Sequence, residues 1–410
     1  MLNQCPVCNR GHDMLKGYVN PGFTAVADAF RRNLPVDVQG GAALCVYHRG
    51  IPVVDIWAGS SDQQGTPWAA DTLSLSFSTT KGIVSTLLHT LADRGEVNYD
   101  LPVAHYWPEF ARNAKSRITV RHLLTHEAGL YGIRSLITDA SEMRDWEHML
   151  RVMEEAPPVH VPGQKNGYHA LTYGWLVGGL IEKVARQPLA KTLKDELVDP
   201  LGLDGCHIGV PEPDLVRCAK LIVPAKKTEP VQQRKKGINW SRKVSEAVFS
   251  LAGFDQEKFQ DAMLPKGMSR FDWNAPETMQ ASIPGAGGMF TARSLARIYS
   301  VLANNGEYES GRLLSAETVR EMSTVQNTTR GDVIPVPMRW RLGYHRVFTT
   351  GPRTPNAFGH FGYGGSGAWC DPSRELSLGY TVNHGSGSPF GDIRISRINT
   401  AAIRSVESLL

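Results

Sequence analysis

Ser78 and Lys81 stand three residues apart, where a polar, serine-rich segment runs into an apolar one. If a helix begins there, side chains at this spacing lie on one helix face, so the lysine nitrogen reaches the serine oxygen. A serine hydroxyl becomes a nucleophile when a base takes its proton, and lysine serves as that base when burial or another cation lowers its pKa. Free N–H groups at the helix start would stabilise an oxyanion beside Ser78. The alternative is that Ser78 is only a helix N-cap, since Ser-x-x-Lys alone is a weak motif.

Two other segments carry polar side chains next to apolar or glycine-rich sequence. Tyr168 lies in a polar loop just ahead of an apolar segment that predicts a helix, and His360 lies in the strand-like, glycine-rich run 358–369. Glycine inside a strand often marks a close approach of the backbone to a ligand. Each residue has a structural alternative: a buried tyrosine with a bonded hydroxyl, and a strand histidine satisfied by its neighbours. His126 is predicted to be a hydrogen-bonded structural histidine.

The chain is organised around the stretch 72–95, in which a polar approach leads into a helix predicted to begin at Ser78. Its apolar residues cover more than one helix face, which indicates a buried helix, and Gly95 is a suitable stop. Those apolar residues are Ile83, Val84, Leu87, Leu88 and Leu91. Period-two patterns predict a hairpin at 40–59 that turns at Arg49–Gly50, and strands at 340–348 and within 358–380. Further helices are predicted at 21–34, 118–126 with Thr119 as its cap, 142–154, 189–198, 291–304 and from about 392 onward.

Composition places the chain among ordinary globular proteins. It has 410 residues, 41% apolar and 20% charged, with a net charge of +4. This length predicts two domains or one domain interrupted by another, and the diffuse positive charge does not indicate a nucleic-acid partner. No segment is long and apolar enough to suggest a membrane span or a signal peptide, so we expect a cytoplasmic protein without a membrane partner.

Two local features have no assigned function. Cys5 and Cys8 form a lone CxxC with His12 nearby, which lacks the second ligand pair that a structural metal site needs. We therefore expect a loose tail there and no metal, and six scattered cysteines do not suggest a disulfide framework. The basic segment 224–243 is interpreted as a solvated surface loop, with an anionic partner as the alternative.

Taken together, the motifs carry a family resemblance. Ser78-Thr79-Thr80-Lys81, Tyr168 heading an apolar helix, and His360-Phe361-Gly362 on a late strand occur in that order. Supporting runs are residues 54–59, 119–126, 168–174 and 358–360. The chain resembles the serine β-lactamase and penicillin-binding-protein superfamily, and within it the family VIII carboxylesterases, over nearly its whole length.

The resemblance implies a fold and a domain division. The expected class is α+β, with an antiparallel sheet flanked by helices and an inserted all-helical domain. Residues 1–95 and 286–410 would form the sheet domain, and 96–285 the helical insertion. The active site would lie in the cleft between them, a common location for ligand pockets.

The family's roles transfer to this chain position by position. Ser78 matches the acylated nucleophile, Lys81 the lysine that helps deprotonate it, and Tyr168 the tyrosine that shuttles a proton to the leaving alcohol and later activates water. His360 stands where the lactamases carry the lysine of Lys-Thr-Gly. The backbone N–H groups of Ser78 and Tyr363 match the oxyanion donors.

Gly362 completes the third motif and is expected to lie against the substrate. A phenol near two cations, Lys81 and a protonated His360, would have a depressed pKa and serve as a base. Two positions depart from the lactamase pattern: Ala170 replaces asparagine in the second motif, and His360 replaces lysine in the third. Both changes argue against efficient β-lactam hydrolysis, whereas a neutral ester needs no fixed cation.

The expected function is therefore a serine carboxylesterase that cleaves a small ester through an acyl-enzyme on Ser78, without a cofactor. The resemblance implies short acyl chains. Alternatives on the same scaffold are a β-lactamase, a D-amino-acid peptidase or an acyltransferase, and from another class a protein that binds or is acylated without turnover. The chain contains no Gly-x-Ser-x-Gly, no His-Glu-x-x-His and no phosphate-binding glycine loop.

Overall fold

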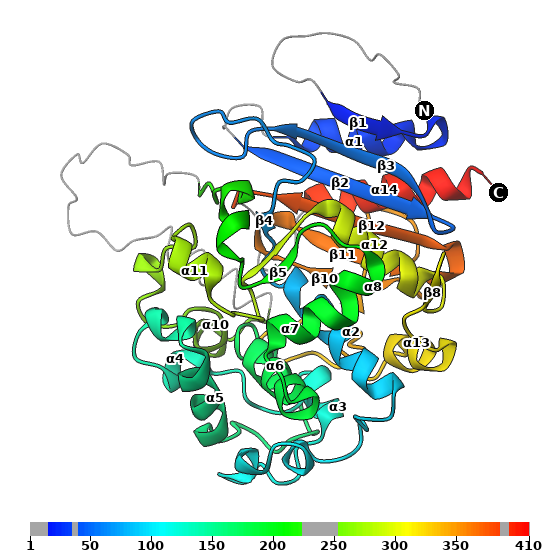
Figure 1. The fold of residues 1–410 in the computed structure, drawn as a ribbon. Helices are drawn as coiled ribbons and strands as arrows, with labels where there is room; N and C mark the ends of the chain where they lie inside the picture. Colours follow the sequence, from blue (N-terminus) through cyan, green and yellow to red (C-terminus); the bar gives the residue numbers. More distant parts are fainter. Residues whose placement is uncertain (1–14, 35–39, 224–252, 386–392, 410) are drawn as a thin grey trace.

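A seven-stranded antiparallel sheet forms the upper layer of the molecule (Figure 1). The computed structural model describes residues 15–34, 40–223, 253–385 and 393–409. The strand order is β1-β3-β2-β12-β11-β10-β9. The strands are β1 (Lys16–Val19), β2 (Gly41–His48), β3 (Ile51–Gly59), β9 (His345–Arg346), β10 (Phe358–Phe361), β11 (Gly367–Asp371) and β12 (Leu376–Val382).

The predicted hairpin is confirmed as β2 and β3. Arg49 and Gly50 form its two-residue turn with φ of 53° and 74°, the left-handed conformation that matches the twist of paired strands. The strand predicted at 340–348 is reduced to β9, and β1 is an edge strand that the sequence pattern did not indicate. Chain segments from both ends of the sequence thus meet at the β2–β12 pair.

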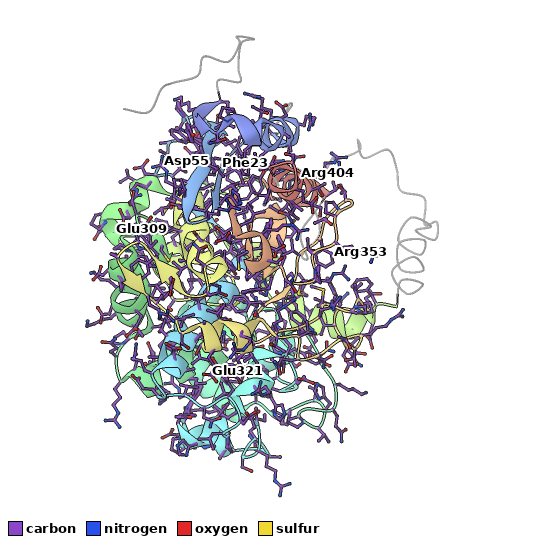
Figure 2. All side chains as sticks on the ribbon, turned by 90° about the vertical axis from the view of Figure 1, so that its right-hand side faces the viewer. Phe23, Asp55, Glu309, Glu321, Arg353 and Arg404 are labelled. Atoms are coloured by element: carbon purple, nitrogen blue, oxygen red, sulfur yellow. The ribbon has the colours of Figure 1, made fainter. Side chains whose placement is uncertain are left out.

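Helices cover both faces of this sheet. On one face α1 (Thr24–Asn33) packs beside α14 (Ile393–Glu407), and Figure 2 shows the two together with Phe23 and Arg404 labelled. On the other face lies α12 (Ala292–Ala303). Because both faces are covered, the central strands β2 and β12 are almost continuously buried. The predicted α+β class, an antiparallel sheet flanked by helices, is confirmed.

Helix α2 (Thr79–Asp93) runs between the sheet and the helical region below it (Figure 1). It packs against β10 on one side and α6 (Thr172–Ala185) on the other. Its apolar residues Ile83, Val84, Leu87, Leu88 and Leu91 are all at most 1% exposed. The prediction of a buried helix that ends near Gly95 is therefore confirmed.

The segment predicted as a helical insertion consists mostly of short helices. Its longer members are α5 (Trp146–Glu155), α6 and α10 (Gln256–Met263). The short ones are η2 (Val103–His105), η3 (Pro108–Ala111), α3 (Val120–Leu124), α4 (Ile133–Leu136), η4 (Ala140–Arg144), α7 (Leu189–Leu193), η5 (Lys194–Val198), α8 (Asp199–Leu201), η6 (Glu212–Arg217), η7 (Met268–Arg270) and α11 (Pro276–Gln280). Whether it is a separate domain stays a prediction.

Three local differences separate this region from the predicted elements. The helix expected at 142–154 is broken at Asp145, whose carboxylate accepts the His148 N–H and so starts α5. The second half of the helix expected at 189–198 is a π-helix. One strand, β5 (Cys206–Ile208), joins β4 (Ser74–Leu75) and β6 (Gly288–Phe290) in a small sheet.

Several sequence features fall on parts of the chain that are not described, namely Cys5, Cys8, His12 and the basic segment 224–243. In the described ranges Cys45, Cys206, Cys218 and Cys370 are buried free thiols. Those ranges contain no group of three His, Cys, Asp or Glu side chains arranged to hold a metal ion. None of the helices there has the length and apolar character that a bilayer crossing requires.

Candidate active site

Ser78 lies at the first turn of α2, directly after a residue in an unusual backbone conformation. Phe77 has φ of 43°, whereas Ser78 itself is helical with φ of −65° and ψ of −9°. The Ser78 side chain caps no backbone N–H of the helix. Ser78 is thus the N-cap residue of α2 by position but makes no capping bond, and its hydroxyl is free to take part in other contacts.

The Lys81 amine contacts that hydroxyl. Lys81 Nζ lies 2.9 Å from Ser78 Oγ and 2.6 Å from each of the carbonyl oxygens of Ala170 and Gly285. Two carbonyls accept two N–H bonds, so a neutral amine keeps one lone pair for the Ser78 proton. An ammonium would donate to all three oxygens, whereas a neutral amine can donate to the two carbonyls and accept from the Ser78 hydroxyl.

The surroundings of Lys81 favour this neutral form. The side chain is fully buried, and burial lowers its pKa well below the usual value. Among the described residues no carboxylate forms an ion pair with it. A lysine can serve as a base if burial lowers its pKa, and Lys81 meets this condition.

The two carbonyls come from segments far apart in sequence. Ala170 belongs to the loop between Tyr168 and α6, and Gly285 to the segment before β6. This segment crosses α6 at Gly174, where a Cβ would strike the Gly285 backbone. Sequence reasoning missed both acceptors, although the glycine-rich run 285–288 was a visible signal of close backbone packing.

Tyr168 lies beside the same hydroxyl. An interaction with the Ser78 side chain lowers the pKa of its phenol, and Lys81 Nζ lies 5.2 Å from the centre of its ring. The ring is stacked on Trp340, with centroids 5.7 Å apart and planes 10° apart. Burial raises the pKa of Tyr168 more than the Ser78 bond lowers it, so the expected depressed pKa is wrong and the phenol keeps its proton.

His360 does not supply the second cation. It is 1% exposed, and its Nδ1 lies 3.3 Å from the carbonyl oxygen of Phe361. Burial, with smaller contributions from His345 and Lys81, lowers its pKa well below the usual value. The expectation of a protonated His360 is therefore corrected: the imidazole is neutral because desolvation disfavours its charged form.

The end of β10 packs directly on the Ser78 turn. A Cβ at Gly362 would strike the carbonyl oxygen of Ser76, and the rings of Phe77 and Tyr363 lie edge to face at 5.4 Å. Gly362 thus allows the backbone to approach the Ser78 turn closely, and its contact with a substrate stays a prediction. Among the described residues no protein oxygen accepts the N–H of Ser78 or of Tyr363. Both donors are available to an oxyanion.

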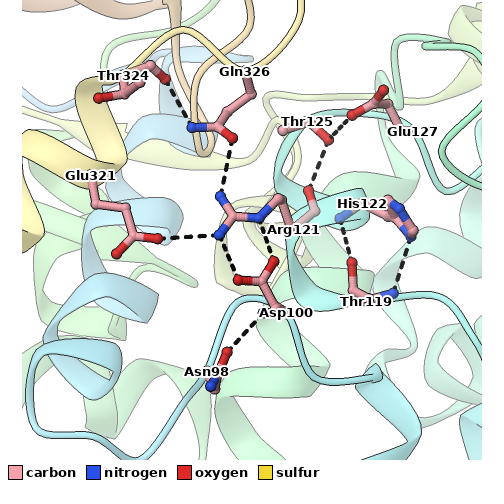
Figure 3. Close-up of polar contacts among 10 residues, drawn as sticks. All are labelled: Asn98, Asp100, Thr119, Arg121, His122, Thr125, Glu127, Glu321, Thr324 and Gln326. Atoms are coloured by element: carbon pink, nitrogen blue, oxygen red, sulfur yellow. Dashed lines mark hydrogen bonds and ion pairs between the residues drawn. The ribbon is translucent and has the colours of Figure 1, made fainter.

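A polar network centred on Arg121 connects α3 to residues far along the chain (Figure 3). Thr119 and His122 form a reciprocal cap on α3, as predicted for Thr119. Arg121 donates to both carboxylate oxygens of Asp100 and to Gln326, and it pairs with Glu321. These bonds join α3 to the segment after α13 (Ala316–Ser323), which leads to Trp340. The network therefore connects α3 to the segment that leads to Trp340, whose ring stacks on Tyr168.

His126 ends this same helix with φ of 61° and is buried against Tyr168 at a ring separation of 5.0 Å. Its Nδ1 accepts the backbone N–H of His169 at 3.2 Å, and His169 Nε2 accepts the N–H of Leu130 at 3.0 Å. Both imidazoles therefore carry an unprotonated nitrogen, and burial lowers both pKa values. The predicted structural, hydrogen-bonded role of His126 is confirmed.

Ser78 opens onto a cavity of about 680 Å³. Phe77 and Tyr363 line the cavity beside Ser78, and α10 and η7 supply residues of its outer part. Its size lies within the range of small-molecule sites. The structure therefore brings together a hydroxyl in contact with a buried amine, two backbone N–H groups that no described protein oxygen accepts, and a cavity of small-molecule size.

Comparison with known proteins agrees with this geometry. The beta-lactamase family model matches residues 30–402. The esterase/beta-lactamase LipL of Mycobacterium tuberculosis is 38% identical over 378 residues, which cover 90% of this chain and 82% of the relative. A crystal structure of a family VIII carboxylesterase superposes with a TM-score of 0.82 at 31% identity, covering 96% of this chain and all of the other.

A penicillin-binding-protein homologue from Caulobacter crescentus also superposes with a TM-score of 0.82, at 30% identity and the same coverage of both chains. The match of the family model spans most of the sequence, including all three motif segments. The resemblance inferred from the motifs is confirmed, and the chain belongs to the beta-lactamase family.

Proposed function

We propose that this protein is a serine carboxylesterase that hydrolyses uncharged esters through an acyl-enzyme on Ser78. The observation that carries the proposal is the 2.9 Å contact between Ser78 Oγ and a buried Lys81 amine whose other two contacts are carbonyl oxygens. This arrangement leaves the amine lone pair directed at the hydroxyl proton. The esterase names of relatives of this chain support the same reaction class.

Acylation begins with proton transfer from Ser78 Oγ to Lys81 Nζ as the oxygen attacks the ester carbonyl carbon. The carbonyl oxygen becomes an oxyanion that the N–H groups of Ser78 and Tyr363 stabilise. When the tetrahedral intermediate collapses, the bond between the carbonyl carbon and the alcohol oxygen breaks, and Tyr168 donates its phenolic proton to the leaving alcohol. The ammonium of Lys81, beside the Tyr168 ring, stabilises the tyrosinate that forms.

Deacylation reverses these roles with water. The tyrosinate of Tyr168 takes a proton from water, and the resulting hydroxide attacks the acyl carbon. Collapse breaks the bond to Ser78 Oγ, which recovers its proton from the Lys81 ammonium while the carboxylic acid leaves. Each group returns to its starting state. The raised pKa of Tyr168 suits this order because the phenol must hold its proton until the alcohol departs.

Hydrolysis of β-lactams is a second candidate, since LipL is named an esterase/beta-lactamase. We expect β-lactam hydrolysis to be slow in this site. β-Lactam antibiotics carry a carboxylate, and the lysine position of the third motif holds a neutral, buried His360. Nitrocefin should therefore be hydrolysed far more slowly than a p-nitrophenyl ester by the same preparation.

The deciding experiment follows p-nitrophenyl butyrate hydrolysis by the wild type, Ser78→Ala and the matched variant Ser61→Ala. Ser61 is a surface-loop serine whose hydroxyl contacts the Thr66 carbonyl. We expect Ser78→Ala to abolish turnover and Ser61→Ala to retain it. Mass spectrometry after an acid quench should locate the butyryl group on Ser78. Turnover by Ser78→Ala near the wild-type rate, or an adduct on another residue, would remove Ser78 from the mechanism.

Tyr168→Phe tests the proton transfer separately. It keeps the stacked ring but removes the phenolic proton, so we expect turnover to fall by roughly 10² to 10⁴. Tyr344→Phe is the matched control because Tyr344 is a buried tyrosine bonded to Thr86, away from Ser78. If Tyr168→Phe kept most of its rate, Lys81 alone would serve as the base and acid.

A further inference from the structure

We infer that the cavity beside Ser78 binds the acyl chain of the ester and that this chain is uncharged and of medium length, about six to eight carbons. This inference rests on the proposed esterase function and adds the substrate class. It differs from the short acyl chains that the family resemblance implied.

One wall is a row of four aromatic rings that starts at the oxyanion donor. Tyr363 contacts Phe77 at 5.4 Å, Phe77 contacts Trp273 at 5.4 Å, and Trp273 contacts Phe271 at 5.0 Å. All three contacts are edge to face, and all four rings line the cavity. Because each ring fixes the next, the wall is preorganised and extends away from Ser78.

Residues of α10 and η7 and the turn between them add further apolar side chains to the lining. They are Phe259, Met263, Leu264 and Met268. Methionine side chains adapt to ligands of irregular shape. A row of packed aromatic rings together with adaptable methionine and leucine side chains suits an alkyl chain, which has no polar group to satisfy.

No described residue that lines the cavity is charged. The polar groups among their side chains are the hydroxyls of Ser78, Ser269 and Tyr363 and the indole N–H of Trp273. A buried carboxylate or ammonium on the substrate would find no opposite charge there, and such burial is costly. The lining therefore selects an uncharged chain.

The position of the cavity assigns it to the acyl half of the ester. The leaving alcohol must face the proton donor Tyr168, yet neither Tyr168 nor Lys81 lines the cavity. Ser78, whose oxygen bonds to the acyl carbon, and Tyr363, which contributes an oxyanion donor, both do. The chain attached to the carbonyl carbon can therefore enter the cavity while the alcohol departs on the Tyr168 side.

The volume leaves room for a chain of this length. A methylene is comparable in size to a water molecule, whose share of liquid volume is about 30 Å³, so eight such groups occupy roughly 240 Å³. The cavity measures about 680 Å³. An acetyl or propionyl group would leave most of the apolar surface uncovered, whereas an octanoyl chain has room to lie along the aromatic row.

The test compares two ester series with the full-length protein. In the first, the alcohol is p-nitrophenol and the acyl group grows from acetate to butyrate, hexanoate and octanoate. In the second, the acyl group is acetate and the alcohol grows in the same steps. We expect kcat/KM to rise at least about tenfold from acetate to octanoate in the first series, since each buried methylene contributes up to about fourfold, or about 0.8 kcal/mol. We expect little change in the second.

Two variants of rim residues test the location. Ser269→Trp fills the cavity, and Leu264→Asp places a charge in it; both residues line it and are exposed. Each should lower the octanoate-to-acetate ratio of kcat/KM at least about tenfold. Ser408→Trp and Leu409→Asp are matched controls at exposed positions near the end of α14, since Leu264 is 44% and Leu409 54% exposed. The controls should retain the wild-type ratio.

The outcomes separate this inference from the proposed function. A kcat/KM that falls as the acyl chain grows would overturn the assignment of the cavity. So would an octanoate-to-acetate ratio of kcat/KM that Ser269→Trp and Leu264→Asp leave unchanged. Both outcomes are compatible with acetate turnover that depends on Ser78. Sensitivity to alcohol length in place of acyl length would assign the cavity to the leaving group. Absence of turnover with every ester would overturn the esterase proposal itself.

Discussion

The ring of Trp340 lies nearly parallel to the ring of Tyr168, with centroids 5.7 Å apart and planes 10° apart. Trp340 Nε1 also donates to Asn166 Oδ1 at 3.2 Å, two residues before Tyr168. The Trp340 side chain therefore contacts both the ring of Tyr168 and the loop that carries it. Arg339, just before it, has φ of 54°, a costly conformation for a non-glycine residue that packing must maintain.

Replacing Trp340 should reduce catalysis by letting Tyr168 move. We expect Trp340→Ala to lower kcat by roughly 10²-fold, the effect typical of an ångström-scale misplacement of a reacting group. Trp340→Phe keeps an aromatic ring against Tyr168 and should restore most of the rate. The measurement is kcat on p-nitrophenyl butyrate together with the Tm of each variant. Equal rates for both variants at equal Tm would exclude a positioning role for this stack.

Lys81 should determine the acidic limb of the pH–rate profile. As the base it is active when unprotonated, and burial lowers its pKa well below the ordinary value. The rate should therefore fall as pH drops through this lowered pKa, tenfold per pH unit. Lys81→Arg keeps a cation that cannot be deprotonated, so we expect a loss of roughly 10² to 10⁴ in kcat/KM.

Lys115 offers a matched control for that profile. Its Nζ donates to three carbonyl oxygens, those of Arg112, Glu154 and Ala156, and burial lowers its pKa to about 8. It contacts no hydroxyl and lies outside the site. Lys115→Met should leave the midpoint of the acidic limb unchanged, measured as kcat/KM between pH 5 and pH 10. A midpoint that moved with Lys115 would show that the limb reports the stability of the fold.

Gly362→Ala should impair the oxyanion site. An added Cβ would strike the Ser76 carbonyl and lie 3.2 Å from the Phe77 Cβ, so β10 must move away from the Ser78 turn. Loss of an oxyanion donor typically costs about 10² to 10³ in kcat. Gly351→Ala is the control because its Cβ would meet only the flexible end of Arg404. A Gly362→Ala protein with wild-type kcat would contradict the assignment of the Tyr363 N–H.

Buried neutral histidines should make the fold sensitive to acid. His89 bonds to the Tyr99 hydroxyl at 2.8 Å and the Leu342 carbonyl at 3.0 Å, and burial lowers its pKa to about 4. Between its unfolded pKa of about 6.5 and this value, the unfolded chain binds a proton that the folded protein excludes. The free energy of unfolding should therefore decrease as pH falls below about 6.5, by about 1.4 kcal/mol per pH unit for each such histidine.

Urea unfolding at pH 7, 6 and 5 measures this dependence. His89→Gln removes one titrating group and should reduce the slope between pH 6.5 and pH 4 by about 1.4 kcal/mol per unit. The exposed His105 provides the control, and His105→Gln should leave the slope as it is. A slope that His89→Gln does not reduce would show that His89 is not excluded from protonation in the folded protein.

Local sequence determined the features that depend on near neighbours. The three-residue spacing of Ser78 and Lys81 places both on one turn of α2 because helix geometry alone sets that relation. Alternation and the Arg49–Gly50 turn likewise predicted the β2–β3 hairpin. The order of the three motif segments was enough to identify the family, because their side chains perform one reaction wherever the chain folds this way.

Tertiary structure alone decided the protonation states and the shape of the substrate space. The carbonyls of Ala170 and Gly285 reach Lys81 from segments 89 and 204 residues away, and no local pattern encodes that convergence. Burial lowers the pKa of Lys81, as a lysine base requires, but it also makes His360 neutral and keeps the proton on Tyr168, which reversed the charges expected of those two groups. The aromatic row beside Ser78 joins residues 77, 271, 273 and 363 for the same reason: desolvation and packing depend on what surrounds a side chain, which only the folded chain defines.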